Sequence, residues 1–95
     1  MKAKDLLTAI QVDSAGELTQ LSSYQFVFIN EGEQETNHLA VKRTADKIIL
    51  QKNPSERLRL NLFINLLNEA KDAEIYFEEE LVFGYRLVDQ GIVLG

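Results

Sequence analysis

The chain contains no cysteine, and this absence excludes several kinds of site at once. A disulfide framework, a zinc site with thiolate ligands and a cysteine nucleophile all require that side chain. The chain also has a single histidine, His38, and the acids and hydroxyls around it form no metal site and no Ser-His-Asp arrangement. We therefore expect His38 to be a solvent-facing residue at the start of a strand.

Long apolar runs are absent as well. No stretch approaches the roughly 18 apolar residues of a membrane-spanning helix, and the first residues lack the hydrophobic region of a signal peptide. The 5 glycines never take the spacing of a phosphate-binding or dinucleotide-binding loop. We therefore expect a cytoplasmic protein that is not an enzyme, makes no contact with a membrane, and holds no cofactor and no metal ion.

The chain is acidic, but its charge is unevenly distributed. The net charge is −5, and since residues 42–59 hold 6 basic and 2 acidic side chains, that segment carries +4 and the rest −9. Contacts to phosphate supply most non-specific affinity for DNA, so an acidic chain is a poor binder of nucleic acid. The basic segment also has no interleaved aromatic residues on which bases would stack. Nucleic acid is therefore an unlikely partner on sequence grounds.

Residues 54–71 show the clearest helical pattern in the chain. Asn53 suits a helix N-cap, and Pro54 suits the first helical position because its missing N–H is not needed there. At about 100° per residue, one arc collects the apolar side chains of Leu60, Leu62, Phe63, Leu66, Leu67 and Ala70. We predict a helix over 54–71 whose apolar side packs on a sheet.

A competing strand signal lies at the start of this segment. Leu58, Leu60 and Leu62 alternate with polar residues, as in a half-buried strand. Phe63 breaks the alternation, and the whole segment has the length of a helix rather than that of a strand. The helix prediction is therefore preferred.

Shorter elements surround the predicted central helix. Residues 2–11 form an amphipathic helix with Ala3, Leu6, Leu7 and Ile10 on one side, and residues 14–21 form a helical turn. In the last long strand, Leu81, Phe83, Tyr85 and Leu87 are expected to face inward. Alternation and β-branched or aromatic content predict six strands, over 24–30, 38–43, 48–50, 73–78, 81–88 and 92–94.

The two halves of the chain show the same order of elements. Residues 44–51 align with 88–95, and 39–42 with 83–86, at a constant offset of 44 residues. Upstream, Phe26-Val-Phe28 matches Ile75-Tyr-Phe77 once the longer first loop is allowed. Duplication explains these matches, and so does the alternation that any two meanders share.

The predicted fold is α+β, a single domain over residues 1–95 with half-repeats 1–52 and 53–95. Each half has the order αβββ, and about six strands form one antiparallel sheet with the helices packed on one face. The alternative arrangement has two sheets that close around the long helix.

Two groups of residues are candidates for an interaction surface. Strand residues expected to face outward provide more apolar surface than a solvated sheet needs, which indicates a partner protein or a homodimer; they are Val27, Ile29, Ile49, Tyr76 and Val82. The two hairpin loops expected at one end of the sheet carry six carboxylates, those of Glu31, Glu33, Glu35, Glu78, Glu79 and Glu80. The carboxylates would bind a divalent cation weakly, imitate phosphates, or simply keep the turns solvated.

These features predict a small non-enzymatic accessory or adaptor protein that acts through contact with a partner protein or with itself. One alternative is an acidic decoy that occupies the nucleic-acid-binding groove of a host protein, and a third is a small enzyme of undefined class. In size, acidity and lack of cysteine the chain resembles small accessory proteins encoded by phages and prophages of Gram-positive bacteria. No motif carries this resemblance, and it transfers no functional residue.

Overall fold

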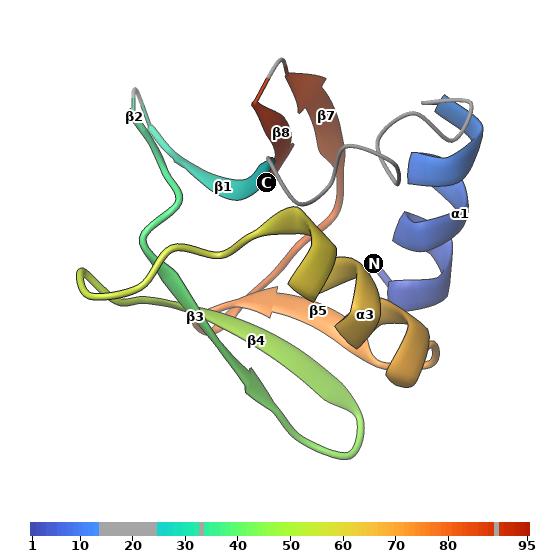
Figure 1. Ribbon diagram of the computed structural model, residues 1–95. Coiled ribbons are helices and arrows are strands. Elements are labelled where there is room, and N and C mark those ends of the chain that lie inside the picture. The colour runs from blue at the N-terminus through green and yellow to red at the C-terminus, as the bar shows by residue number, and fades with distance from the viewer. Residues whose placement is uncertain (14–24, 33, 89) are drawn as a thin grey trace.

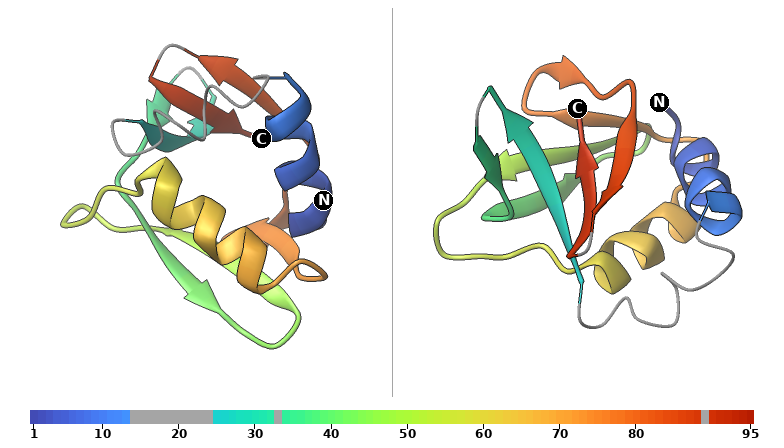
Figure 2. Two further views of the ribbon diagram at one scale, coloured as in Figure 1. Left: turned by 45° about the vertical axis from the view of Figure 1, so that its right-hand side comes forward. Right: turned by 90° about the horizontal axis from the view of Figure 1, so that it is seen from above.

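The computed structural model describes residues 1–13, 25–32, 34–88 and 90–95. In these ranges two helices and eight strands form an α+β fold with two four-stranded sheets. The sheets lie one above the other in Figure 1, and the two helices lie next to each other along one side of them (Figure 2). The helical turn predicted over 14–21 lies outside the described residues. Neither helix in the described ranges combines the length and the apolar content that a membrane span requires.

The first helix, α1 (Ala3–Asp13), confirms the prediction for the N-terminal segment. Its expected apolar side is buried, with Leu6 and Ile10 fully covered and Leu7 almost so. The Ala3 N–H donates to the Ala73 carbonyl over 2.8 Å, so a first-turn donor that has no partner within the helix is satisfied by the second half of the chain.

The second helix, α3 (Leu60–Glu69), begins six residues later than predicted. The Asn53 side chain does cap a backbone N–H, but it is that of Ser55, and the Glu56 N–H donates to the Asn53 carbonyl. These bonds form a turn, because Asn before Pro favours turns as well as helix starts. The prediction of helix over 54–59 is therefore wrong.

The segment from Leu58 to Leu60, whose alternation is typical of a strand, pairs with the start of the first strand. The Val27 N–H donates to the Leu58 carbonyl and the Leu60 N–H donates to the Gln25 carbonyl, each over 2.9 Å. The chain therefore stays extended beside the first strand until Leu60 and only then turns into α3. A tertiary contact overrides the local helix signal.

The core side of α3 is also turned relative to the prediction. Leu60, Phe63, Ile64 and Leu67 are buried, whereas Leu62 is 53% exposed. Leu66 is only half-buried. One edge of the predicted apolar arc therefore remains outside the core.

Two sheets replace the single antiparallel sheet of the prediction. We call them the β1 sheet and the β4 sheet after a central strand of each. The β1 sheet has the order β2 (Gln34–Thr36), β1 (Phe26–Glu31), β8 (Gly91–Leu94), β7 (Tyr85–Val88). The β4 sheet has the order β3 (Leu39–Arg43), β4 (Lys47–Lys52), β5 (Glu74–Phe77), β6 (Glu80–Leu81).

Each sheet has a parallel pair at its centre and an antiparallel hairpin partner at each side. Each half of the chain supplies one hairpin to each sheet, so the predicted meander of the first half does not form. The physical reason lies in continuous apolar runs such as Ile92-Val93-Leu94, which are typical of central strands covered on both faces. All four residues of β8 are buried.

The offset of 44 residues is visible in the register of two hairpins. Val41 lies opposite Leu50 in one hairpin, and Tyr85 lies opposite Leu94 in the other. The upstream match is shifted by one residue. Phe26 pairs with Gly91, and Lys47, the equivalent of Gly91 at this offset, pairs with Glu74 rather than with Ile75. Within the described residues each half has one helix and four strands, so the predicted order αβββ is wrong, and duplication of the two halves stays a prediction.

The strand predicted over 81–88 is divided between the two sheets. β6 ends at Leu81 in the β4 sheet, and β7 begins at Tyr85 in the β1 sheet. The chain crosses from one sheet to the other at residues 82–84, where Phe83 is 81% exposed, and Leu87 in β7 is 41% exposed. The expected inward orientation of these two side chains is therefore wrong.

Substitution of Gly91 tests the parallel pairing of β1 with β8. The φ of Gly91 is +142°, and an added Cβ would lie 1.9 Å from the Phe26 carbonyl oxygen. We expect Gly91→Ala to lower the free energy of unfolding in urea by about 3 kcal/mol or more. Gly84→Ala is the matched control, since no atom lies within 4 Å of the added Cβ, and should change it by less than about 1 kcal/mol. Equal effects of the two variants would contradict this packing.

Candidate functional site

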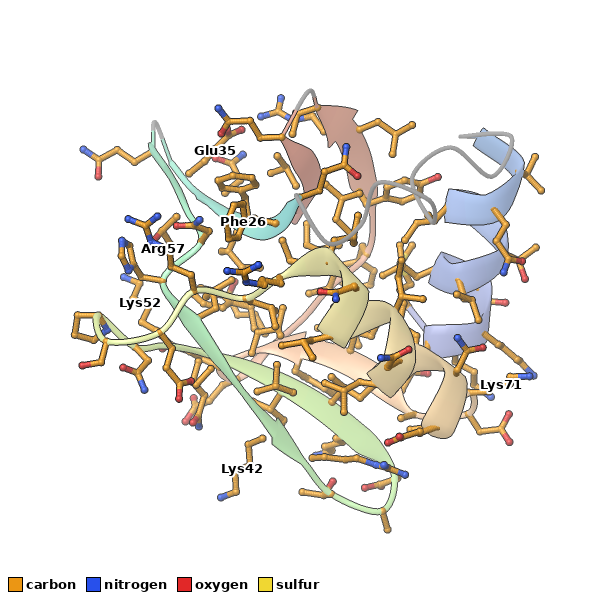
Figure 3. All side chains as sticks on the ribbon, in the orientation of Figure 1. Phe26, Glu35, Lys42, Lys52, Arg57 and Lys71 are labelled. Atoms are coloured by element: carbon orange, nitrogen blue, oxygen red, sulfur yellow. The ribbon has the colours of Figure 1, made fainter. Side chains whose placement is uncertain are left out.

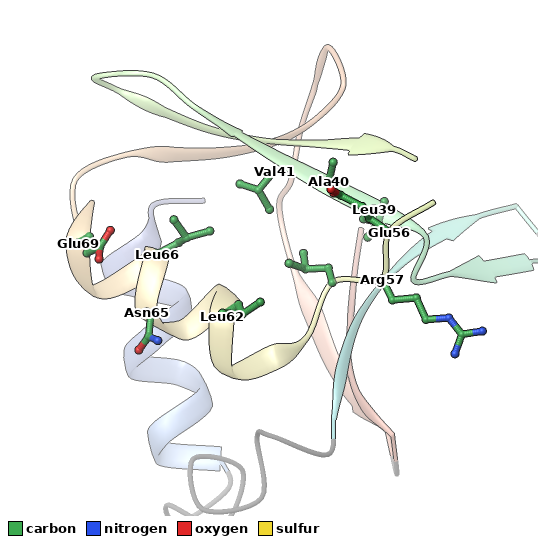
Figure 4. Close-up of a pocket in the computed structure, with 10 residues that line it drawn as sticks. Leu39, Ala40, Val41, Glu56, Arg57, Leu62, Asn65, Leu66 and Glu69 are labelled. Atoms are coloured by element: carbon green, nitrogen blue, oxygen red, sulfur yellow. The ribbon is translucent and has the colours of Figure 1, made fainter. Parts of the chain in front are cut away.

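A groove of about 580 Å³ between β3 and α3 is the candidate site of this molecule. Figure 4 shows Val41 from β3 and Leu62 and Leu66 from α3 pointing into the space between the two elements. Leu39 and Leu58 complete its apolar lining. The groove therefore combines side chains from a strand, a helix and the extended segment that precedes the helix.

The groove is open because the β4 sheet ends at β3. β3 is the edge strand of that sheet, and among the described residues only β4 pairs with it. Leu62 and Leu66 lie one helical turn apart, so they form a short apolar ridge beside this edge. A further strand next to β3 would cover the ridge.

Charged side chains mark the two ends of the groove. At one end the Arg43 Nη1 lies 3.0 Å from the Glu69 Oε2, which joins the end of β3 to the last turn of α3. Glu56 and Arg57 lie at the other end (Figure 4). Arg57 is exposed and makes no ion pair with any described residue. Because both partners of the Arg43 pair are about half exposed, we attribute to it a positional role and little stability.

The backbone of β3 presents an unpaired N–H and carbonyl at Val41 on its open edge, whereas the Leu39 N–H donates to the Asn37 carbonyl. The Asn53 N–H donates to the His38 carbonyl and the Thr44 N–H donates to the Lys47 carbonyl, each over 2.9 Å. Antiparallel bonding alternates along a strand, so Ala40 and Lys42 also bond to β4 while the N–H and carbonyl of Val41 point away from it. The edge beside the groove can therefore form further backbone hydrogen bonds.

The predicted apolar face is found only in part. Val27, Ile29 and Val82 are 0%, 2% and 3% exposed, so the prediction that they face outward is wrong. They face the interior that the two sheets share with the helices. Ile49 and Tyr76 are half-buried neighbours across β4 and β5, and the Lys47 Nζ lies 5.1 Å from the Tyr76 ring centre. This pair is too small to form an interaction surface alone.

The predicted acidic residues belong to two different sheets. Glu31 and Glu35 are in the β1–β2 hairpin, whereas Glu78, Glu79 and Glu80 are in the exposed β5–β6 hairpin. The single acidic sheet end that we expected is therefore not formed. Glu33 lies outside the described residues, and Glu35 forms an ion pair with Arg86. Within the described ranges no three histidines or carboxylates are grouped to hold a metal ion.

His38 lines a cavity of about 290 Å³ together with Lys52 of the basic segment. His38 is half-buried rather than solvent-facing, and its buried Nδ1 has no hydrogen-bond partner among the described residues. Figure 3 shows Lys42 well apart from Lys52 and Arg57. Lys42 therefore lies on a different part of the surface from Lys52 and Arg57.

No protein-family model matches the chain, and no match was found among curated proteins or solved structures. The function is therefore argued from the geometry of the molecule.

The exposure of Leu62 gives a test of the groove. We expect Leu62→Asp to lower the free energy of unfolding in urea by less than about 1 kcal/mol, since the side chain is half in water and an acid suits the first turn of a helix. The matched variant Leu67→Asp places a charge in the core and should cost more than about 4 kcal/mol. A comparable loss from both variants would show that Leu62 belongs to the core.

Proposed function

We propose that the protein is a non-enzymatic binding module that holds a partner protein in the groove between β3 and α3. The observation that carries this proposal is the convergence of the 53% exposed Leu62 with Leu66 and Val41 beside an open sheet edge. A single exposed leucine is ordinary on a protein surface. Several apolar side chains that meet in one groove are typical of a surface that a partner covers.

The polar side chains around the groove support binding over catalysis. They are those of Glu56, Arg57, Asn65 and Glu69, and Glu69 is already paired with Arg43. This set contains no nucleophile and no base within reach of one. The groove is suited to recognising a surface or a peptide.

The acidic decoy has less support than the groove. A phosphate-like array needs several uncompensated carboxylates on one face, and Glu35 is compensated by Arg86. The carboxylates of Glu78, Glu79 and Glu80 remain exposed in one hairpin. They belong to the β4 sheet, whereas Glu35 belongs to the β1 sheet, and they do not line the groove.

A displayed library of random peptides of about twelve residues tests this function. We expect selection on the wild-type protein to enrich peptides whose binding is lost with Leu62→Asp, because the charge would lie in the apolar lining of the groove. Leu87→Asp is the matched control, since Leu87 is a 41% exposed leucine on β7 that does not line the groove. It should bind the selected peptides as the wild type does. The proposal would be contradicted if the enriched peptides bound Leu62→Asp as they bind the wild type, or if no peptide were enriched.

A further inference from the structure

We infer that the partner enters the groove as an extended segment that adds an antiparallel strand to β3, with apolar residues at alternate positions and an acidic residue opposite Lys42. The inference rests on the proposed function and adds to it the mode of binding and the chemistry of the partner. It follows from the backbone, the apolar lining and the charges of the groove, taken in turn.

The backbone of β3 supplies the hydrogen bonds that such a strand needs. The N–H and carbonyl of Val41 point away from β4, because the bonded positions of the hairpin are those of Ala40 and Lys42. Among the described residues β3 has no neighbour on that side. A partner strand about 4.8 Å away would pair with these groups and extend the β4 sheet.

The apolar lining supplies the side-chain contacts. Residues directly opposite each other in an antiparallel pair project from the same face of the sheet. The partner residue opposite Val41 would therefore project toward α3, where Leu62 and Leu66 are incompletely covered. The residues two positions away project the same way, so the groove selects apolar side chains at alternate positions.

The uncompensated charge of Lys42 favours an acidic residue in the partner strand. Lys42 projects from the opposite face of β3, is exposed, and makes no ion pair with any described residue. A carboxylate opposite it would form a favourable cross-strand pair. A strand antiparallel to β3 also brings its carboxyl end to Arg57, which lies with Glu56 at that end of the groove and has no ion pair with the described residues.

The same charges disfavour a second copy of this chain as the occupant. Two β3 strands paired about Val41 would place Lys42 opposite Ala40 and Arg43 opposite Leu39. The two Lys42 side chains would then lie on one face of a short ladder with no acid from either β3, while each Arg43 keeps its Glu69 partner. A segment that supplies its own carboxylate avoids this repulsion.

The peptides selected on the wild-type protein provide the probe for this mode. Their consensus should show apolar residues at every second position with an acidic residue between two of them. An N-methyl group on the residue opposite Val41 removes a hydrogen bond to β3 and should weaken binding about tenfold or more. An N-methyl group on the next residue, whose N–H points away from β3, is the matched control and should change the affinity less than about twofold.

The acidic preference is tested by exchanging charges. Replacing the acidic residue of a selected peptide by lysine should weaken its binding to the wild type about fivefold. Lys42→Glu should reverse this order, so that the lysine peptide binds the variant more tightly than the acidic peptide does. The order would stay the same on both proteins if Lys42 did not face the peptide.

The outcomes separate this inference from the proposed function. Strand addition would be overturned, with the groove kept as the site, by peptides whose binding requires Leu62 but whose apolar residues have helical spacing. Peptides whose affinity is unchanged by either N-methyl group would have the same consequence. Absence of any peptide that needs Leu62 would overturn both. Light scattering on the free protein should give a monomer, and a dimer that Leu62→Asp dissociates would assign the groove to a second copy.

Discussion

The fold depends on the parallel pairing of strands from opposite halves of the chain, β4 with β5 and β1 with β8. These pairs place each of the apolar runs at Ile48 to Leu50 and Ile92 to Leu94 in a strand that has a neighbouring strand on both sides. Each remaining hairpin strand is then left at an edge of its sheet. β3 is the edge strand that lies beside the apolar ridge of α3, and so the candidate groove follows from the same pairing that builds the core.

The sequence predicts the elements of this fold better than their partners. The period of residues 2–11 and the turns around Lys47 report local geometry, and these elements form near their predicted limits. Asn53-Pro54 suits a turn and a helix start equally. The beginning of α3 is therefore decided by two backbone hydrogen bonds, from the Val27 N–H to the Leu58 carbonyl and from the Leu60 N–H to the Gln25 carbonyl. Alternation likewise identifies the apolar face of a strand, but it does not identify the sheet in which that strand pairs.

The candidate site could be found from the sequence only in part. Leu62 and Leu66 fall on the predicted apolar arc, but periodicity does not distinguish a side chain that fills the core from one that awaits a partner. A local signal does exist in β3, because Lys42-Arg43 at the end of an apolar strand is typical of an edge that must avoid uncontrolled pairing. Val27 and Val82 show the converse error, since apolar residues expected to face outward are covered by a second layer.

The open edge of β3 is the central claim, and amide hydrogen exchange of the free protein measures it most directly. The N–H groups of Ala40 and Lys42 bond to β4, whereas that of Val41 points away from the sheet. We predict that the Val41 amide exchanges at least about tenfold faster than its two neighbours, because it has no backbone acceptor. Equal protection of all three amides would show that the edge is already covered, and it would contradict this account of the groove.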